Sequence, residues 1–525
     1  MRIVSDVRRG LIPAVMLAAA VNMAAAEQAP PTTPPNVQTS ISAGVVETRT
    51  PRPTRKARAR KPHRALAFTT PVGDDALTDD LSRMLHARVS RGEWGVAVIS
   101  LTRGDTLFTH RADASMSPAS TMKLFTTVLA YETLGPTFQF RTEVLRTGTL
   151  SADGVASGDL VLRGGGDPAL SGRYIGGGPN APADLLAAHV AAAGIKRVRG
   201  NLIADETAFD LQRVPVGWPS RYLGASYAPR ISALSMNENS ALVYVTPDGA
   251  RATLQLVPPS TTMRLVNEVR VVPGRRSRIG VFTPDDSTIV LRGTVGKSNG
   301  PRAWTVMITN PALFVGGAFR AALASRGIQI DGDVVLGHAP ADCTPVASVA
   351  SPPVGKLAAI MNGESVNHFA ELMFRGAARI GNASGSALAA GRLLDSLLTF
   401  RAGAARGAVI ATDGSGLSTL NRVTARSLVH LLGYADHASW SWDFHTSLPV
   451  AGETELLRRR MRLTPAQGNL HAKTGTLSRV TSLSGYVRAL NGEQLAFAFL
   501  YNGPQHAGAV ETIDAMGATL AAFTR

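Results

Sequence analysis

Hydrophobic and polar positions alternate in two short runs near the start of the chain, Trp94–Leu101 and Thr106–His110. Alternation with a period of two predicts β-strands, and the polar turn Arg103-Gly104-Asp105 between them predicts a hairpin. The pattern then changes. Residues 120–134 carry apolar side chains at helical spacing and are followed by Gly135-Pro136, so we expect a mostly buried helix there.

From about residue 148 the chain shows short β-branched runs between glycine-rich turns. The stretch 241–300 predicts a small all-β module, with strands Leu242–Thr246 and Ala252–Val257 around a Pro-Asp-Gly turn. After Val346 we expect helices Val354–Met361, His368–Ile380, Ser386–Thr399, Thr424–His430 and Ala507–Phe523, and strands Thr481–Leu490 and Glu493–Tyr501. A pair of strands is thus placed between helices from the early part and the late part of the chain. This arrangement predicts one α/β domain assembled from both ends of the chain.

Residues 1–26 have the pattern of a secretory signal peptide. Two arginines precede the apolar run Leu11–Val21, and Ala24–Ala26 supplies the small residues that a signal peptidase recognises. A membrane anchor is the alternative, but a span needs about 20 apolar residues, and this run is shorter and contains Pro13. The sequence therefore predicts export to the periplasm or cell envelope.

Residues 27–66, first Pro/Thr-rich and then basic, predict a disordered linker. Residues 1–66 hold eleven Lys/Arg and three acidic residues, a net charge of +8 out of +16 for the chain. The remainder is only mildly basic, which argues against a nucleic-acid partner. The linker is expected to be solvated, with weak attachment to a membrane or wall polymer as the alternative. Cys343 is the only cysteine, so no intramolecular disulfide can form.

Candidate chemistry begins with Ser120-Thr121-Met122-Lys123 at the start of the predicted helix. Residues three apart share a helix face, so Lys123 can reach the Ser120 hydroxyl. A lysine held neutral by its surroundings can accept the proton of a nucleophilic serine. Alone this short motif also fits an exposed lysine and a capping serine.

Two further motifs favour the catalytic interpretation of Ser120 and Lys123 over the structural one. Ser365-Val366-Asn367 opens a predicted helix and supplies a hydroxyl and an amide. Lys473-Thr474-Gly475 runs into the closing strands, where the lysine offers a cation to a carboxylate and the glycine lets a substrate backbone approach. Together the three motifs provide a nucleophile, a proton relay, an amide clamp and a carboxylate anchor.

On these motifs the sequence resembles the D-alanyl-D-alanine carboxypeptidase/endopeptidases of the low-molecular-mass class C penicillin-binding proteins, peptidase family S13, over roughly residues 75–520. Family-like phrases support the resemblance: Gly164–Pro168, Ala228-Pro229, Ser232–Asn239, Asp413–Ser418, Ser447–Gly452 and Lys473–Leu477. Ser365 follows Ser120 by 245 residues, which matches a family with two domains inserted there. The chain departs from the family at Val366, where an acid is frequent, and at Thr419, where some relatives carry a basic residue.

The resemblance implies an α/β (α+β) fold of the serine transpeptidase/β-lactamase type, with a catalytic domain built from both chain ends and two inserted β-rich domains. The expected division is residues 67–147 and 346–525 for the catalytic domain, 148–240 and 301–345 for inserted domain II, and 241–300 for inserted domain III.

The resemblance also implies roles for the motif residues. Ser120 would attack the carbonyl of the penultimate D-alanine, with Lys123 as the base. Ser365 and Asn367 would relay a proton and orient the substrate amide. The substrate-binding set would be Lys473, Thr474, Gly475 and Thr476, with the backbone N–H groups of Ser120 and Thr476 as the oxyanion hole. No cofactor or metal is expected.

The expected partners are peptidoglycan stem peptides and cross-links, with β-lactam antibiotics as covalent inhibitors. Asp205 is a candidate contact for a free amine of the peptide, although a turn-forming aspartate fits it equally well. Two other functions compete: a β-lactamase or esterase with the same nucleophile, and a non-catalytic peptidoglycan-binding scaffold. The large insertion argues against the first, and the three intact motifs argue against the second.

Overall fold

The computed structural model describes residues 66–379 and 383–525. The predicted signal peptide and nearly all of the predicted linker lie outside the described residues. Within the described ranges, no helix combines the length and apolar character that a membrane crossing requires.

The sheet that carries the third motif draws its strands from both ends of the chain. Its order is β17 (His471–Leu477), β18 (Val480–Arg488), β19 (Gln494–Asn502), β1 (Glu93–Ser100) and β2 (Thr106–His110). All neighbours are antiparallel, and Ala97 of β1 lies opposite Ala498 of β19. The predicted hairpin and the two predicted closing strands are thereby confirmed, and they pair with each other.

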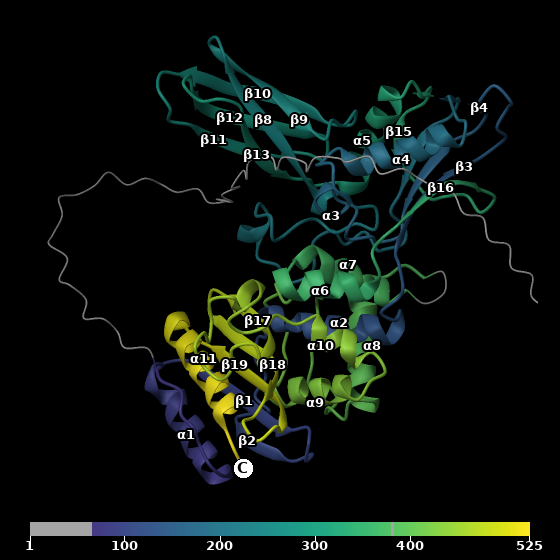
Figure 1. Ribbon diagram of the computed structural model, residues 1–525. Helices are drawn as coiled ribbons and strands as arrows, with labels where there is room; N and C mark the ends of the chain where they lie inside the picture. The colour runs from purple at the N-terminus through teal and green to yellow at the C-terminus, as the bar shows by residue number, and fades with distance from the viewer. Residues whose placement is uncertain (1–65, 380–382) are drawn as a thin grey trace, which may run out of the picture. The chain divides into compact units, whose positions relative to one another are not determined.

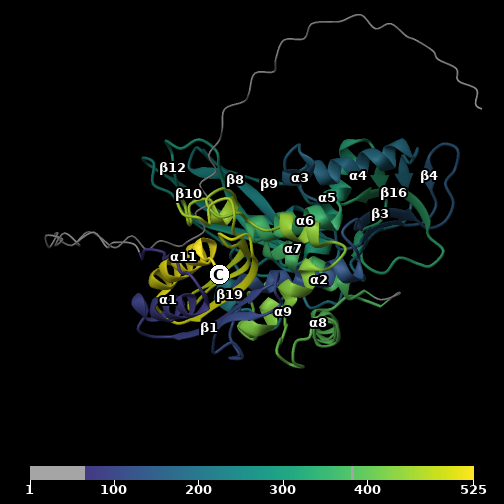
Figure 2. The same cartoon turned by 60° about the horizontal axis from the view of Figure 1, so that its bottom comes forward.

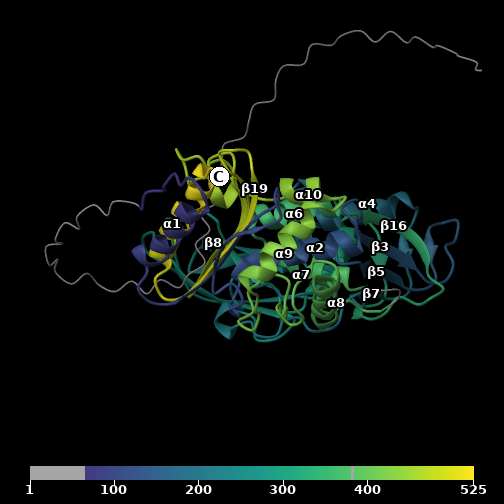
Figure 3. The same cartoon turned by 90° about the horizontal axis from the view of Figure 1, so that it is seen from below.

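Both faces of this sheet are buried, which explains why β19 is almost continuously apolar. Successive side chains of a strand point to opposite faces. Phe497 and Phe499 pack with α1 (Asp74–Ala87) and α11 (His506–Ala522), whereas Ala498 and Leu500 pack with the helices of the other face. Figure 1 shows α1 and α11 on one side of the sheet and α2 and α9 on the other, and Figure 3 shows the same separation of α1 from α2 and α9.

The second face is covered by a group of helices around one hydrophobic cluster. These are α2 (Met122–Thr133), α6 (Val354–Glu364), α7 (Asn367–Ala377), α8 (Ala387–Phe400), α9 (Ala425–Asp436) and α10 (Ser441–Thr446). α2 is buried along nearly its whole length. This helix therefore forms the centre of the cluster and fixes the residues at its N-terminal end.

The chain between α2 and α6 forms three further sheets. One has the order β15 (Val334–Leu336), β7 (Leu202–Asp205), β5 (Leu160–Gly164), β3 (Arg141–Arg146) and β16 (Thr344–Ala350). A small one comprises β14 (Gln329–Ile330), β6 (Arg197–Val198) and β4 (Val155–Ala156). The third has the order β11 (Arg278–Phe282), β12 (Thr288–Gly296), β10 (Arg264–Val272), β9 (Arg251–Val257), β8 (Ser240–Asp248) and β13 (Arg302–Met307).

Two helices in this inserted region were not expected from the sequence, α4 (Ala181–Ala192) and α5 (Pro311–Ser325). Figure 2 shows both beside the sheet that contains β3 and β16. α5 contains Gly316 and Gly317, a pair that disfavours a helix. Here the glycines permit close packing, since a Cβ on Gly316 would lie 2.7 Å from Cγ1 of Val334. Side chains of all three inserted sheets share one hydrophobic cluster with these two helices.

Candidate active site

Ser120 lies in a single 3₁₀ turn, Ala119–Thr121, and α2 proper begins at Met122, two residues later than the sequence predicted. Ala119 has a φ of 49°, a conformation that costs about 1–3 kcal/mol for a residue with a side chain. The carbonyl of Pro118 accepts hydrogen bonds from Thr121 Oγ1 at 2.8 Å and from Ser482 Oγ at 2.7 Å. The strained turn is thus tied both to its own helix and to the sheet.

Two glycines let other segments approach this turn. A Cβ on Gly475 would lie 2.6 Å from the Pro118 carbonyl oxygen and 3.1 Å from the Ser120 nitrogen, and one on Gly416 would lie 1.8 Å from the Ala119 oxygen. Separations under 3.0 Å are not tolerated by a Cβ against backbone. Gly475 therefore has a packing requirement within the protein itself, in addition to the substrate contact predicted for it.

Lys123 is fully buried, and its Nζ makes three hydrogen bonds. It donates to Ser120 Oγ at 3.1 Å, to Asn367 Oδ1 at 2.7 Å and to the backbone carbonyl of Ser415 at 2.7 Å. The first and second motifs, 244 residues apart at Lys123 and Asn367, are therefore brought together by one amine. Ser120 itself is half-buried, so its hydroxyl remains open to a ligand.

Burial lowers the pKa of Lys123 to about 7, because an ammonium without water around it is disfavoured. The carboxylates of Asp413 and Glu371 act in the opposite direction and raise this pKa. At neutral pH the amine is consequently present in part without its extra proton. This is the state that a general base requires.

Neither Asp413 nor Glu371 was singled out from the sequence as a site residue, although Asp413 opens one of the family-like phrases. Both are fully buried. Asp413 accepts hydrogen bonds from the backbone N–H of Gly416 at 2.8 Å and of Ser418 at 2.7 Å, and Glu371 accepts one from that of Ser415 at 2.9 Å. The two acids therefore shape the loop whose carbonyl holds Lys123. Glu371 lies one helical turn after Asn367, the only sequence signal that could have indicated it.

Ser365 lies between α6 and α7 in a left-handed conformation, with φ 61°. As predicted, α7 begins with the second motif, at Asn367. The Ser365 hydroxyl accepts a hydrogen bond from Lys473 Nζ at 3.0 Å. Lys473 also donates to the carbonyl of Thr474 at 3.0 Å. The second and third motifs are therefore joined as well.

Lys473 is also fully buried. Burial lowers its pKa well below the usual value, and the nearby charge of Lys123 lowers it further. Two amines with depressed pKa values thus lie in one site, each bonded to a serine hydroxyl. Such a pairing is typical of a catalytic centre rather than of a structural core.

The third motif forms a strand of its own, β17, rather than the beginning of the closing strands. β17 is an edge strand, with β18 on one side only. Thr476 is exposed and Thr474 is half-buried along it. An edge strand presents unpaired backbone groups to which an extended peptide can add.

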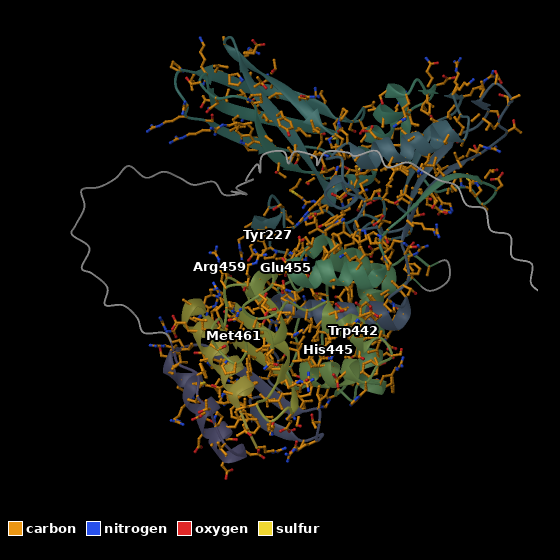
Figure 4. All side chains as sticks on the ribbon, in the orientation of Figure 1. Tyr227, Trp442, His445, Glu455, Arg459 and Met461 are labelled. Atoms are coloured by element: carbon orange, nitrogen blue, oxygen red, sulfur yellow. The ribbon has the colours of Figure 1, made fainter. Side chains whose placement is uncertain are left out.

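Asn367 makes a contact that the sequence did not indicate. Its side-chain amide donates a hydrogen bond to the backbone carbonyl of Tyr227 at 2.7 Å. Tyr227 belongs to the inserted region and is itself about half exposed; Figure 4 labels it. A substrate carbonyl that binds the Asn367 amide must compete with this contact.

Asp205, by contrast, is fully buried at the end of β7. Its carboxylate accepts hydrogen bonds from the N–H and hydroxyl of Thr207, at 2.9 and 2.6 Å, and from the N–H of Ala339 at 2.9 Å. This is the geometry of a turn-forming aspartate. Its contact with a substrate amine stays a prediction and would require the carboxylate to become exposed.

The site holds the groups that acyl transfer through a serine requires. It combines an accessible serine, a buried amine of pKa about 7 beside it, a second hydroxyl bonded to a second amine, and a free strand edge. Across residues 66–379 and 383–525, no three or more His, Cys, Asp or Glu side chains are grouped to hold a metal ion.

Known proteins share this arrangement of the chain. Penicillin binding protein 4 from Haemophilus influenzae matches with a TM-score of 0.71 at 24% identity, over 82% of this chain and 97% of that one. The match confirms the predicted fold class. A second structure of that protein, complexed with a β-lactam, has a TM-score of 0.66 at 23% identity, over 82% of this chain and 97% of that one.

Sequence comparison defines the family. The chain is 33% identical over 484 residues to the D-alanyl-D-alanine carboxypeptidase of Actinomadura sp. (strain R39), which covers 87% of each protein. It is 28% identical to carboxypeptidase DacB of Mycolicibacterium smegmatis, over 97% of this chain and 94% of the relative. The sequence profile of the D-Ala-D-Ala carboxypeptidase 3 (S13) family matches residues 77–523. Since that match spans the described sheets and all three motifs, the chain belongs to the D-Ala-D-Ala carboxypeptidase 3 (S13) family.

Proposed function

We propose that this protein is a serine-type D-Ala-D-Ala carboxypeptidase that works through an acyl-enzyme on Ser120 and is acylated by penicillins. The observation that carries the proposal is the 3.1 Å hydrogen bond between Lys123 Nζ and Ser120 Oγ, made by an amine whose pKa is lowered to about 7. Membership of a D-Ala-D-Ala carboxypeptidase family supports the same chemistry.

In the proposed reaction the Ser120 oxygen attacks the carbonyl of the penultimate D-alanine while Lys123 takes the hydroxyl proton. The backbone N–H groups of Ser120 and Thr476 stabilise the oxyanion, a contribution of about 3–4 kcal/mol per donor. The C–N bond then breaks, and the departing amine receives a proton through Ser365. Water hydrolyses the ester and restores the serine.

The remaining motif residues would position the substrate. Lys473 and Thr474 would bind the terminal carboxylate, and the free edge of β17 would pair with the peptide backbone. Asn367 would bind the substrate amide once its contact with Tyr227 is released. We take the substrates to be peptidoglycan stem peptides and their cross-links.

We also propose that the protein acts outside the cytoplasm, in the periplasm or cell envelope. This rests on the signal-like pattern of residues 1–26. The basic segment that follows would give weak association with a membrane or wall polymer.

The function is tested by incubating the protein with benzylpenicillin and mapping the adduct by mass spectrometry. One equivalent on Ser120 is expected, together with release of D-alanine from an N-acyl peptide ending in D-Ala-D-Ala. The Ser120→Ala variant should lose both while melting normally, and Ser115→Ala, an exposed serine nearby, should lose neither. An unchanged adduct on the Ser120→Ala variant would refute the assignment. Rapid release of hydrolysed penicillin would instead favour a β-lactamase.

A further inference from the structure

A pocket of about 580 Å³ lies next to the second motif, among residues given no role above. Its lining includes Arg173, Glu364, Glu455, Leu456, Arg458 and Arg459. Figure 4 labels two of these residues, Glu455 and Arg459. Glu364 directly precedes Ser365, whose hydroxyl is bonded to Lys473. The pocket wall is therefore linked to the proposed carboxylate anchor, Lys473, through the hydroxyl of Ser365.

The pocket lies at a defined end of the edge strand. The N–H of Ala472 donates to the carbonyl of Pro449 at 2.9 Å, and Val450 pairs with His471. The segment that leads to the arginines thus covers the edge of β17 up to Ala472, and the free edge begins at Lys473. In the proposed binding mode, the reacting carbonyl of the peptide lies near Thr476 and its terminal carboxylate lies near Lys473. Any part of the leaving group that extends past this carboxylate then lies toward the pocket.

The charged residues of this segment differ in whether they form ion pairs. Arg458, Arg459 and Arg460 are consecutive, and only Arg460 forms an ion pair, to Asp514 through nitrogen–oxygen distances of 2.8 and 2.6 Å. Arg458 and Arg459 are exposed and form no ion pair with any residue of the described ranges. Two guanidinium groups are left to bind an anion, and guanidinium binds carboxylate in a bidentate manner.

The acids in and beside the pocket form no ion pair with these two arginines. Arg173 is paired with Glu364 and lies 3.7 Å from a carboxylate oxygen of Glu238, so one cation is shared by two carboxylates. Glu455 alone has no ion pair among the described residues. The lining residues are three arginines and two glutamates, and with Glu238 the charges are equal in number, so what favours an anion is that Arg458 and Arg459 form no ion pair among the described residues.

The turn that presents the arginines is firmly held. Leu457, between Leu456 and Arg458, is fully buried, and its N–H donates to the carbonyl of Thr454 at 3.1 Å. Its own carbonyl accepts from the N–H of Gly452 at 3.0 Å. The two guanidinium groups are consequently carried by a fixed backbone, which lowers the entropy cost of binding.

We propose that Arg458 and Arg459 form a subsite for a second carboxylate, carried by the leaving group of the cleaved peptide. The preferred substrates would then be those whose leaving group is larger than D-alanine and anionic, as in a cross-link between two stem peptides. The proposal rests on the proposed function, because the position of the leaving group follows from the roles of Ser120 and Lys473.

The test uses two peptides with the same N-acyl-D-alanyl donor. In one the leaving residue is D-α-aminoadipate, whose side chain ends in a carboxylate. In the other it is D-norleucine, which has a side chain of the same length without charge. The wild-type protein should cleave the aminoadipate peptide with kcat/KM about five- to tenfold higher, the size of one charged hydrogen bond partly exposed to water. Added salt should reduce that ratio, since exposed charges are screened.

The double variant R458A/R459A should bring the ratio close to one, with unchanged acylation by benzylpenicillin and unchanged cleavage of the norleucine peptide. Arg462→Ala, an exposed arginine of the same segment outside the pocket, should behave as wild type. A ratio near one in the wild type, a ratio that survives in the double variant, or equal losses on both peptides would each overturn the subsite. Absence of both acylation and cleavage in the wild type would overturn the proposed function, and the subsite with it.

Discussion

Lys123 and Lys473 are both fully buried, and each amine is bonded to the hydroxyl of a serine, at 3.1 Å to Ser120 and at 3.0 Å to Ser365. Charge on Lys123 lowers the pKa of Lys473. A proton on Lys123 therefore disfavours one on Lys473. The charge of Lys123 thus opposes a cation at Lys473, whereas a substrate carboxylate bound beside Lys473 would favour one.

Lys123→Arg should abolish acylation. A guanidinium keeps its proton in proteins, so it cannot accept that of Ser120. The measurement is the rate of benzylpenicillin acylation, accompanied by a thermal melt to show that the larger side chain is accommodated. Lys356→Arg, an exposed lysine on α6, is the matched control. Acylation within a few-fold of wild type in a folded Lys123→Arg protein would mean that another group is the base.

The acylation rate should rise with pH through about 7, where Lys123 loses its proton. Below that value the amine is protonated and cannot act as a base, so the rate falls on the acidic side. Burial raises the pKa of Glu371 to about 7, so this side chain carries part of a negative charge near neutral pH. Glu371→Gln removes that charge, whose presence raises the pKa of Lys123, and its Oε1 can still accept from the N–H of Ser415. The acidic limb of the profile should therefore move to lower pH in this variant. A limb that moves to higher pH would contradict the assignment.

Gly475→Ala should disturb the nucleophile. The added Cβ would lie 2.1 Å from Ser482 Oγ and 2.6 Å from the Pro118 carbonyl oxygen, so strand and turn must separate. Overpacking of this kind costs about 1–3 kcal/mol of unfolding free energy, and acylation should slow as Ser120 moves. Gly300→Ala is the control, because a Cβ there meets nothing within 4 Å. Normal stability and normal acylation in the Gly475→Ala variant would show that the site is looser than described.

Asp205→Ala should lower stability by about 1–3 kcal/mol, because the buried N–H of Ala339 and the partly buried N–H of Thr207 lose their acceptor. Denaturant unfolding measures this loss. The predicted substrate contact gives a different outcome: kcat/KM falls only for a peptide with a free amine on its third residue, while stability and penicillin acylation stay as in wild type.

The sequence predicted those features that depend on local pattern. The alternation in Thr106–His110 gave a strand with those same bounds, and the helical spacing after Ser120 gave α2. The Ser120–Lys123 contact follows from three-residue spacing on a helix, so it was predictable as well. The three motifs were found because each is compact in sequence.

Features that arise where residues far apart in the sequence come together were not predicted. Glu371 influences Lys123 only because α7 packs beside α2, and no local pattern indicates that charge. The contact of Asn367 with Tyr227 joins a motif to an inserted segment through a backbone carbonyl, which every residue possesses. Gly316 and Gly317 indicate a break by propensity, yet they lie inside α5 because neighbouring segments need their small size.

The pairing of β1 with β19 also affects how the protein is made. Ala97 meets Ala498, 401 residues later, and Arg525 bonds to Asp74. During synthesis the strand β1 therefore remains without its partner β19 until almost the whole chain has left the ribosome. Such long-range pairing folds slowly and leaves strand edges open to aggregation. Ser120 and Lys123 are therefore translated early, whereas Lys473 joins the site only near the end of synthesis, so we expect an unfinished chain not to be acylated.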